Sequence, residues 1–212
     1  MSEAKGTADQ TSEPLLYVVD DDPAMRDALQ ALLTSVGLRS LAFSSAAEFL
    51  EQYRPHPEAC LLLDIRMPGM SGLELQRRLI DEQIEIPVIV ITGHGDVSMA
   101  VEAMKAGAVD FVEKPFREQA LIDRVTACLK IARETHQARQ ERAALEGRLN
   151  RLSNREHQVL EQILEGKPSK VIGADLEISR KTVDVHRGRI MEKLGVKNVA
   201  ELVRQVTAIR GR

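Results

Sequence analysis

Five short apolar runs, separated by amphipathic stretches, constrain the fold of the first 130 residues more than any other feature. The runs have four or five residues and lie near turn-forming residues, which is typical of buried β-strands. Between them, apolar residues recur with a helical period. Regular alternation of strands and helices predicts a parallel sheet with helices on both faces. The predicted strands are 15–19, 39–43, 60–63, 87–91 and 109–112, and the predicted helices are 23–35, 46–53, 72–80, 98–106 and one that begins near Glu118.

The remaining residues are helical in pattern. After residue 119 the helical period continues with few breakers to Leu149, and we interpret residues 133–149 as a solvated linker helix. We therefore expect a flexible tail at 1–13, an α/β domain at 14–132, the linker at 133–149 and an all-α domain at 150–212. The alternative is a helix that pairs with a partner through Leu121, Val125, Leu129 and Ala132.

The lengths of the apolar runs and the positions of the cysteines indicate the cellular compartment of the protein. No run approaches the ~20 residues that a membrane helix needs, and the polar N-terminus lacks a signal-peptide core. We therefore expect a cytoplasmic protein without a membrane partner. Cys60 and Cys128 show no metal-ligand spacing, so we expect buried free thiols.

Charge is divided unevenly along the chain. Residues 151–212 hold 13 Lys and Arg against 8 Asp and Glu, whereas residues 1–150 hold 16 against 24. A basic C-terminal part can neutralise the phosphates of a nucleic acid, and an acidic N-terminal part does not favour that partner. Many such charge imbalances reflect only a solvated surface. Sequence motifs are therefore needed to show whether the C-terminal part binds nucleic acid.

Acidic residues follow two of the predicted strands. Asp20, Asp21 and Asp22 come directly after the first strand, and Asp64 comes directly after the third. These carboxylates should converge, because the carboxyl ends of parallel strands meet at one edge of the sheet. A hard cation, Mg²⁺ or Mn²⁺, would offset their repulsion and suit a site that receives a phosphoryl group. Taken alone, the triplet before Pro23 also fits a helix N-cap.

Two further polar residues belong to the same edge. Thr92 ends the fourth strand, and Lys114 follows the fifth. Each supplies a hydrogen-bond donor that a phosphoryl group on Asp64 would require. His94 lies between two glycines, which favours a loop near this pocket over a metal ligand.

Residues 14 to about 132 resemble the receiver domain of two-component response regulators. The resemblance rests on these residues and on the segments Leu-Asp-Ile-Arg-Met-Pro-Gly-Met-Ser-Gly, Thr-Gly-His-Gly-Asp and Met-Lys-Ala-Gly-Ala-Val-Asp-Phe-Val-Glu-Lys-Pro-Phe, which are similar to the FixJ-like branch. It implies a flavodoxin-like fold with five parallel strands in the order 2-1-3-4-5. It also implies Asp64 as phosphoacceptor, Thr92 and Lys114 as phosphoryl contacts, and a metal site of Asp20, Asp21, Asp64 and the backbone carbonyl of Arg66.

The same resemblance implies a switch. A sensor histidine kinase would phosphorylate Asp64, the Thr92 hydroxyl would move toward the phosphoryl group, and Phe111 would turn into the vacated space. The alternative is that Phe111 is only a core residue. Similar regulators pair through the surface of residues 101–107 and the strand that follows, so we expect a homodimer after phosphorylation.

The unit after residue 150 has the spacing of a helix-turn-helix. Ser153 and Glu156 predict a capping box at the start of one helix. A short helix at 169–176, a turn at 177–178 and a longer helix capped by Ser179 and ending near Leu194 follow. An amphipathic basic helix is often only a solvated surface, so this spacing alone does not establish DNA binding.

Residues 150–208 resemble the LuxR-type DNA-binding domain. The matching segments are Ser-Asn-Arg-Glu, Glu-Gly-Lys-Pro-Ser-Lys-Val-Ile-Gly, Ile-Ser-Arg-Lys-Thr-Val and His-Arg-Gly-Arg-Ile-Met-Glu-Lys-Leu-Gly-Val. Asp184 and Gly188 depart from the basic residues often found at their positions, so no base preference is transferred. Arg187, which the helical pattern places away from the core, is our first candidate for base reading. The resemblance implies promoter DNA as partner, with phosphate contacts among Lys170, Arg180, Lys181, Thr182 and Lys193, and base-edge contacts among Asp184, Val185, Arg187 and Gly188.

Together these features predict a phosphorylation-dependent transcription regulator, an activator that recruits RNA polymerase. One alternative is a repressor, or a DNA-binding dimer that ignores phosphorylation; intact Asp64, Thr92 and Lys114 argue against phosphorylation independence. A second alternative is a Mg²⁺-dependent phosphatase with an Asp nucleophile. The attached DNA-binding unit argues against this enzyme, so we expect no catalysis beyond self-phosphorylation at Asp64.

Overall fold

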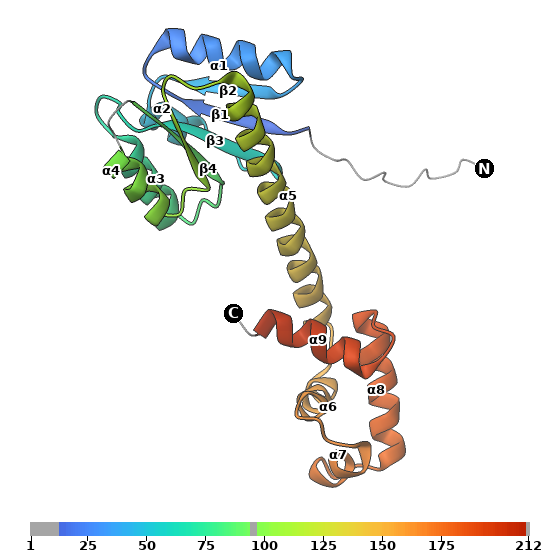
Figure 1. Cartoon of the computed structure of the whole chain (residues 1–212). Coiled ribbons are helices and arrows are strands. Elements are labelled where there is room, and N and C mark those ends of the chain that lie inside the picture. Colours follow the sequence, from blue (N-terminus) through green and yellow to red (C-terminus); the bar gives the residue numbers. More distant parts are fainter. Residues whose placement is uncertain (1–12, 94–96, 211–212) are drawn as a thin grey trace, which may run out of the picture. The chain divides into compact units, whose positions relative to one another are not determined.

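The computed structural model describes residues 13–93 and 97–210, which divide into two compact units (Figure 1). The first unit ends at His136, and the second begins at Gln137. The predicted flexible tail, apart from Glu13, and His94 lie outside the described residues. The first unit contains β1 (Leu15–Val19), α1 (Pro23–Ser35), β2 (Arg39–Phe43), α2 (Ala46–Gln52), β3 (Ala59–Asp64), α3 (Gly72–Asp81), β4 (Val88–Thr92), α4 (Val97–Lys105), β5 (Asp110–Glu113) and the start of α5 (Glu118–Leu149).

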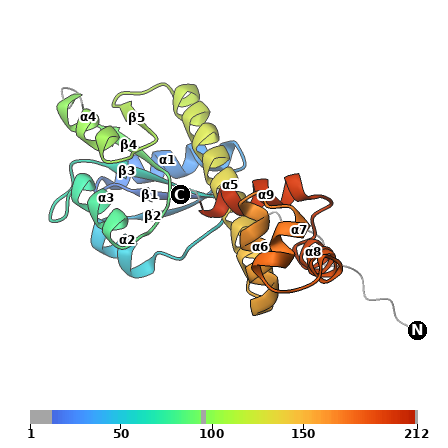
Figure 2. The same ribbon diagram turned by 90° about the horizontal axis from the view of Figure 1, so that it is seen from below.

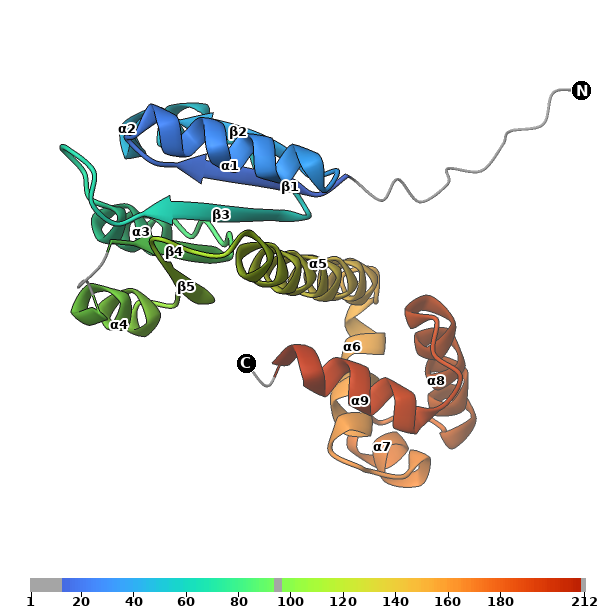
Figure 3. The same cartoon turned by 45° about the horizontal axis from the view of Figure 1, so that its top comes forward.

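The five strands form one parallel sheet in the order β2-β1-β3-β4-β5, as predicted. In Figure 3 the arrowheads of β1 and β3 point the same way. Strands β4 and β5 each begin and end one residue later than expected, and their last residues, Thr92 and Glu113, are register partners. A central strand ends where its neighbours stop pairing with it, which a run of apolar letters does not reveal.

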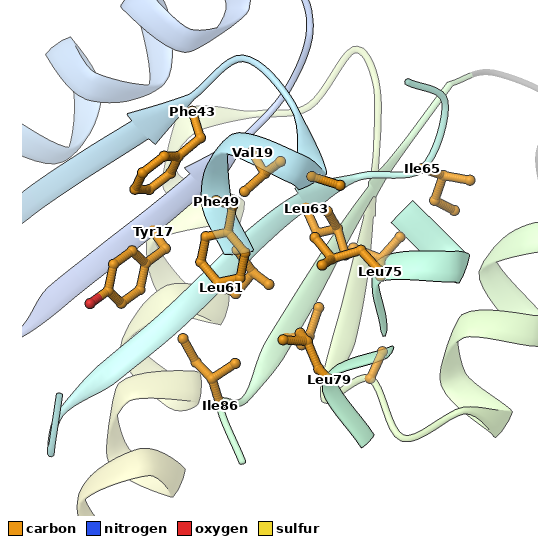
Figure 4. Packing of buried hydrophobic residues seen from close by; sticks show 14 of the residues in the cluster. Tyr17, Val19, Phe43, Phe49, Leu61, Leu63, Ile65, Leu75, Leu79 and Ile86 are labelled. Carbon is orange, nitrogen blue, oxygen red and sulfur yellow. The ribbon is translucent and has the colours of Figure 1, made fainter. Parts of the chain in front are cut away.

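Alternate residues of the strands build two separate cores, one on each face of the sheet. Tyr17, Leu61 and Leu63 face α2, α3 and α4, where the rings of Phe43 and Phe49 pack against Tyr17 (Figure 4). Residues on the other face of the strands pack against α1 and α5, for example against Leu29, Leu33, Leu121 and Val125. Because helices cover both faces of the sheet, the central strands have almost continuously apolar sequences.

Cys60 and Cys128 are joined by a disulfide bond, so the expectation of free thiols is wrong. Both residues are completely buried in the core between the sheet and α5. Their Cα atoms are 6.2 Å apart, although 68 positions separate them in sequence. Spacing rules for cysteines apply to neighbours in sequence, whereas this pair is brought together only by the packing of α5 on β3.

Local caps explain where several helices begin. Asp22 is the N-cap of α1 and accepts a hydrogen bond from the backbone nitrogen of Ala24, with Pro23 in the first turn. Ser71 and Glu74 form a capping box at the start of α3. Ser179 caps α8, as expected. These short polar side chains satisfy backbone N–H groups that have no partner within the helix.

The second unit is entirely helical in its described residues (Figure 2). The last part of α5 belongs to it, because Leu145 lies in the same core as Val159, Ile190 and Leu202. None of the helices in residues 13–93 and 97–210 combines the length and hydrophobicity of a membrane span. The other helices of this unit are α6 (Asn154–Leu164), α7 (Ser169–Asp175), α8 (Arg180–Leu194) and α9 (Val199–Arg210).

A charged pair holds α6 and α8 together. The capping box of α6 was predicted from Ser153 and Glu156, and it is present. The Glu156 carboxylate, only 3% exposed, also accepts a hydrogen bond of 2.6 Å from the Lys193 ammonium. Lys193 and the backbone nitrogen of Ser153 lower the pKa of Glu156 to about 2. Lys193, predicted as a DNA phosphate contact, therefore has an intramolecular partner.

This pair predicts how the second unit responds to acid. Because the pKa of Glu156 is about 2 in the folded protein and about 4.5 in an unfolded chain, its stabilising effect is present above pH 4.5 and is lost as the pH falls toward 2. Glu156→Gln should lower stability at pH 7 by about 1–2 kcal/mol and flatten the pH dependence. Hydrogen exchange in peptides of α6 and α8 during urea titration measures this. Glu161→Gln, at a half-exposed pair with Arg210, is the control; equal effects of both variants would contradict the prediction.

Candidate functional site

Four polar residues meet at the carboxyl edge of the parallel sheet. Asp20 follows β1, Asp64 ends β3, Thr92 ends β4 and Lys114 follows β5. Lys114 donates hydrogen bonds of 2.9 Å to Asp20 and 2.6 Å to Asp64. Its own backbone nitrogen donates to the carbonyl of Thr92 at 2.8 Å, which fixes the loop that carries it. The side chains of Asp20, Asp64 and Lys114 are therefore in direct contact, and Thr92 is joined to them through its backbone carbonyl.

Burial gives the carboxylates of this pocket their particular electrostatics. Asp20 is 1% exposed and Asp64 is 6% exposed. Burial raises the pKa of Asp64, and the hydrogen bond and positive charge of Lys114 oppose this rise. Burial alone would lower the pKa of Lys114, but hydrogen bonds to Asp64 and Asp20 raise it on balance. Lys114 therefore stays charged and is the counter-ion of two acidic groups.

Backbone and side-chain donors hold the two aspartates in place. The backbone nitrogen of Arg66 donates to Oδ2 of Asp64 at 2.8 Å, and that of Asp22 donates to Oδ1 of Asp20 at 2.9 Å. Arg26 donates to the backbone carbonyl of Asp20 at 2.7 Å. Arg26 was not predicted as part of the site, because nothing in the sequence marks a residue one turn into α1 as reaching back to β1.

Two buried carboxylates make this pocket a candidate site for a hard divalent cation. Asp21 is exposed, whereas Asp22 serves as the helix cap, so the triplet has three different environments. In residues 13–93 and 97–210 there is no group of three His, Cys, Asp or Glu residues placed to hold a metal ion. Lys114 balances the buried carboxylates, and a cation would supply the same compensation. The ligand set of Asp20, Asp21, Asp64 and the Arg66 carbonyl remains a prediction.

Thr92 and Phe111 differ sharply in exposure. Thr92 is 2% exposed at the end of β4, beside the pocket. Phe111, on β5, is 39% exposed, so the alternative that it is only a core residue is wrong. Val101 and Met104 of α4 are likewise exposed apolar residues. The face of α4 and β5 therefore presents apolar side chains to solvent.

Gly72, the first residue of α3, packs directly against the phosphoacceptor candidate. A Cβ atom at this position would lie 2.2 Å from the backbone oxygen of Asp64. Its backbone nitrogen donates to the carbonyl of Ile65 at 2.9 Å. Only glycine allows this close approach, which fixes α3 against the end of β3.

The second unit contains the predicted helix-turn-helix. Helix α7 ends at Asp175, one residue earlier than expected, and α8 begins after its cap, Ser179. Gly173 allows α7 to approach the turn closely, because a Cβ there would lie 2.8 Å from the carbonyl oxygen of Ile178. Arg155 of α6 donates to the carbonyl of Leu176 and so supports the same turn.

Most residues predicted to contact DNA lie on the surface of this motif. On α8, Val183, Ile190 and Leu194 are buried, and Val185 is 46% exposed on the opposite side. Arg187 is only partly exposed, so it does not point fully away from the core as expected. Thr182 is exposed but hydrogen-bonded to the Ser179 cap. The other exposed candidates are Lys170, Arg180, Lys181, Asp184, Gly188 and Lys193.

Comparisons with known proteins agree with both halves of this description. Residues 16–126 match the response regulator receiver domain family, and residues 150–206 match the luxR family of bacterial regulatory proteins. The chain belongs to the response regulators with a receiver domain and a LuxR-type DNA-binding domain, and it is a transcriptional regulator.

Individual relatives resemble nearly the whole chain. The response regulator protein TmoT of Ectopseudomonas mendocina is 46% identical over 91% of this chain and 87% of its own length. The transcriptional regulatory protein FixJ of Azorhizobium caulinodans is 48% identical over 89% of this chain and 90% of its own. The solved structure of the response regulator StyR matches with a TM-score of 0.83 and 46% identity, and it covers 93% of this chain and 100% of its own.

Proposed function

We propose that this regulator is controlled by phosphorylation of Asp64 and that a sensor histidine kinase supplies the phosphoryl group. The observation that carries the proposal is the pair of hydrogen bonds from Lys114 to the buried Asp20 and Asp64 carboxylates. Because Lys114 is one positive charge shared by two acids, the Asp64 carboxylate keeps its charge and can act as a nucleophile. The ammonium of Lys114 lies beside it as a hydrogen-bond donor for phosphoryl oxygens.

Each residue of the pocket has its own role in the transfer of the phosphoryl group to Asp64. An oxygen of Asp64 attacks the phosphorus in line, a P–O bond to the carboxylate forms, and the P–N bond of the phosphohistidine donor breaks. Lys114 turns toward the phosphoryl oxygens as their charge approaches. Receiver domains generally bind Mg²⁺ at this pocket, and here Asp20, Asp21, Asp64 and the Arg66 carbonyl would hold it. A bound ion would offset negative charge on the transferring group.

The phosphorylated state then changes the surface of α4 and β5. Thr92 is buried beside the pocket and has a hydroxyl that can donate to the new phosphoryl group. Movement of Thr92 gives Phe111, now 39% exposed, a place to turn inward. The exposed Val101 and Met104 lie on the same face, which supports pairing of two receiver domains there.

The paired proteins would present two helix-turn-helix motifs to half-sites on promoter DNA. Side chains of Lys170, Arg180, Lys181, Thr182 and Lys193 are our candidates for phosphate contacts, and those of Asp184, Val185 and Arg187, with the backbone at Gly188, for base edges. Because Asp184 and Val185 are more exposed than Arg187, we rank them above it for base reading. We place this function in the cytoplasm and infer activation through RNA polymerase, with repression as the alternative.

Labelling with a small phosphodonor tests the proposal directly. Acetyl phosphate with Mg²⁺ should add one phosphoryl group per chain, and Asp64→Asn should take up none, as followed by intact-protein mass spectrometry. Asp110→Asn, at an acid on β5 whose side chain is 34% exposed and pairs with Arg124, is the matched control and should still be labelled. Continuous turnover of acetyl phosphate without an accumulated phosphoprotein would instead favour the phosphatase alternative.

A further inference from the structure

A buried glutamine joins helices α3 and α4. Gln76, in the middle of α3, is 3% exposed. Its side-chain nitrogen donates to the carbonyl of Ala103 at 2.9 Å and to that of Ala106 at 3.0 Å. The opposite orientation of the amide would place its oxygen against two carbonyl oxygens, so the orientation is fixed. The side-chain oxygen has no hydrogen-bond partner among the described residues.

The carbonyls that Gln76 binds are at the C-terminal end of α4. The helix ends at Lys105, and Gly107 follows with a positive φ of 91°. The backbone nitrogen of Ala108 returns to the carbonyl of Ala103, and that of Gly107 returns to the carbonyl of Met104. These bonds satisfy two of the last carbonyls, and Gln76 supplies a donor to the carbonyl of Ala106.

The buried side chains of α4 are small, and the partly buried Met99 also packs against the core. Its buried residues at positions 100 and 103 are alanines, whereas Val101 and Met104 are exposed. Small side chains bury little apolar area, so packing contributes less here than in α1 or α5. The neighbouring contact between α3 and α4 is the ion pair of Arg77 and Glu102, both about half exposed. An exposed ion pair adds little stability compared with one buried and one partly buried hydrogen bond.

Helix α3 is itself fixed to the phosphoacceptor pocket. Gly72 contacts the backbone of Asp64 so closely that no side chain fits between them. Gln76 lies one turn further along α3. Asp64, Gly72, Gln76 and the end of α4 therefore form one connected series of contacts. This connection is separate from Thr92 and Phe111.

We propose that Gln76 is a positioning residue that anchors the C-terminal end of α4 to α3, so that phosphorylation displaces the N-terminal end of α4 and leaves the anchored end in place. This inference rests on the proposed control by Asp64. Helix α4 then rotates about its anchored end at residues 103–106.

Hydrogen exchange on the full chain tests the anchor in the resting protein. Gln76→Met keeps the length of the side chain and removes both hydrogen bonds. Amides in peptides covering residues 103–108 should then exchange about tenfold faster. Arg77→Met is the matched control on the same helix and should change exchange less than twofold. If Gln76→Met leaves residues 103–108 as protected as in the wild type, the anchor does not exist.

The hinge is tested by the same measurement with beryllofluoride and Mg²⁺ as the phosphoryl mimic. In the wild type, exchange should change in peptides of residues 97–102 and stay constant in 103–108, whereas in Gln76→Met both should change. A wild-type change of equal size at both ends overturns the hinge. If the mimic changes nothing anywhere in the wild type, the proposed phosphorylation control fails, and the resting comparison still reports on the anchor. Gln76→Leu, which likewise removes both donors without placing a charge in the core, replaces Gln76→Met if that variant does not fold.

Discussion

Gly72→Ala should destabilise the receiver domain by about 3 kcal/mol, because the new Cβ would lie 2.2 Å from a backbone oxygen. That oxygen belongs to Asp64, so it cannot move aside without shifting the end of β3 and the pocket. We therefore also expect slower labelling of Asp64 by acetyl phosphate. Urea unfolding followed by hydrogen exchange in peptides of β3 and α3 measures the loss.

Gly147→Ala is the matched control. Gly147 lies inside α5, and a Cβ at this position would meet nothing within 4 Å. This variant should be unchanged or more stable, by up to about 1 kcal/mol, because alanine favours the helix over glycine. A Gly72→Ala protein as stable as Gly147→Ala would show that α3 is not fixed against Asp64 as described.

Lys114→Met should cost about 2 kcal/mol at pH 7.5 in the absence of divalent cations. The variant leaves Asp20 and Asp64 buried without their common counter-charge, and breaking such a group is expensive. The difference from the wild type should narrow toward pH 5, because the pKa of Asp64 rises further without Lys114 and a neutral acid needs no counter-charge. Urea unfolding at several pH values measures this difference.

Two comparisons sharpen the test of Lys114. Lys130→Met removes a lysine whose side chain is 75% exposed, and it should cost less than about 0.5 kcal/mol. Millimolar Mg²⁺ should restore part of the stability lost in Lys114→Met, because a cation compensates the same two carboxylates. Equal stability of the two lysine variants would mean that Lys114 is not the counter-ion that the contacts indicate.

Local signals in the sequence predicted the elements of the first unit closely. Strands β1 and β2 and helix α1 have the predicted bounds, because each is limited by a turn or cap such as Asp22. The pocket was predictable for a different reason. Parallel strands bring their carboxyl ends together, so Asp20, Asp64 and Lys114 had to meet once the strand order was known.

Contacts between distant segments were not predictable in the same way. The bond between Cys60 and Cys128 depends on where α5 packs, and Gln76 reads in sequence as an ordinary polar residue of a helix. Arg187 was misplaced because it lies four residues after Val183 and three before Ile190, which puts it on the same stripe of α8 as the buried residues. Similarly, Leu145 was assigned to a linker, yet it lies in the core of the second unit. Each case required the tertiary structure.

Binding to promoter DNA with and without a phosphodonor tests whether phosphorylation of Asp64 controls this regulator. Gel shifts with genomic promoter fragments would compare the wild type and Asp64→Asn, each with and without acetyl phosphate and Mg²⁺. The phosphodonor should tighten binding of the wild type at least tenfold and leave binding by Asp64→Asn unchanged. Equal binding by both proteins under all conditions would leave a DNA-binding protein but contradict its control by phosphorylation.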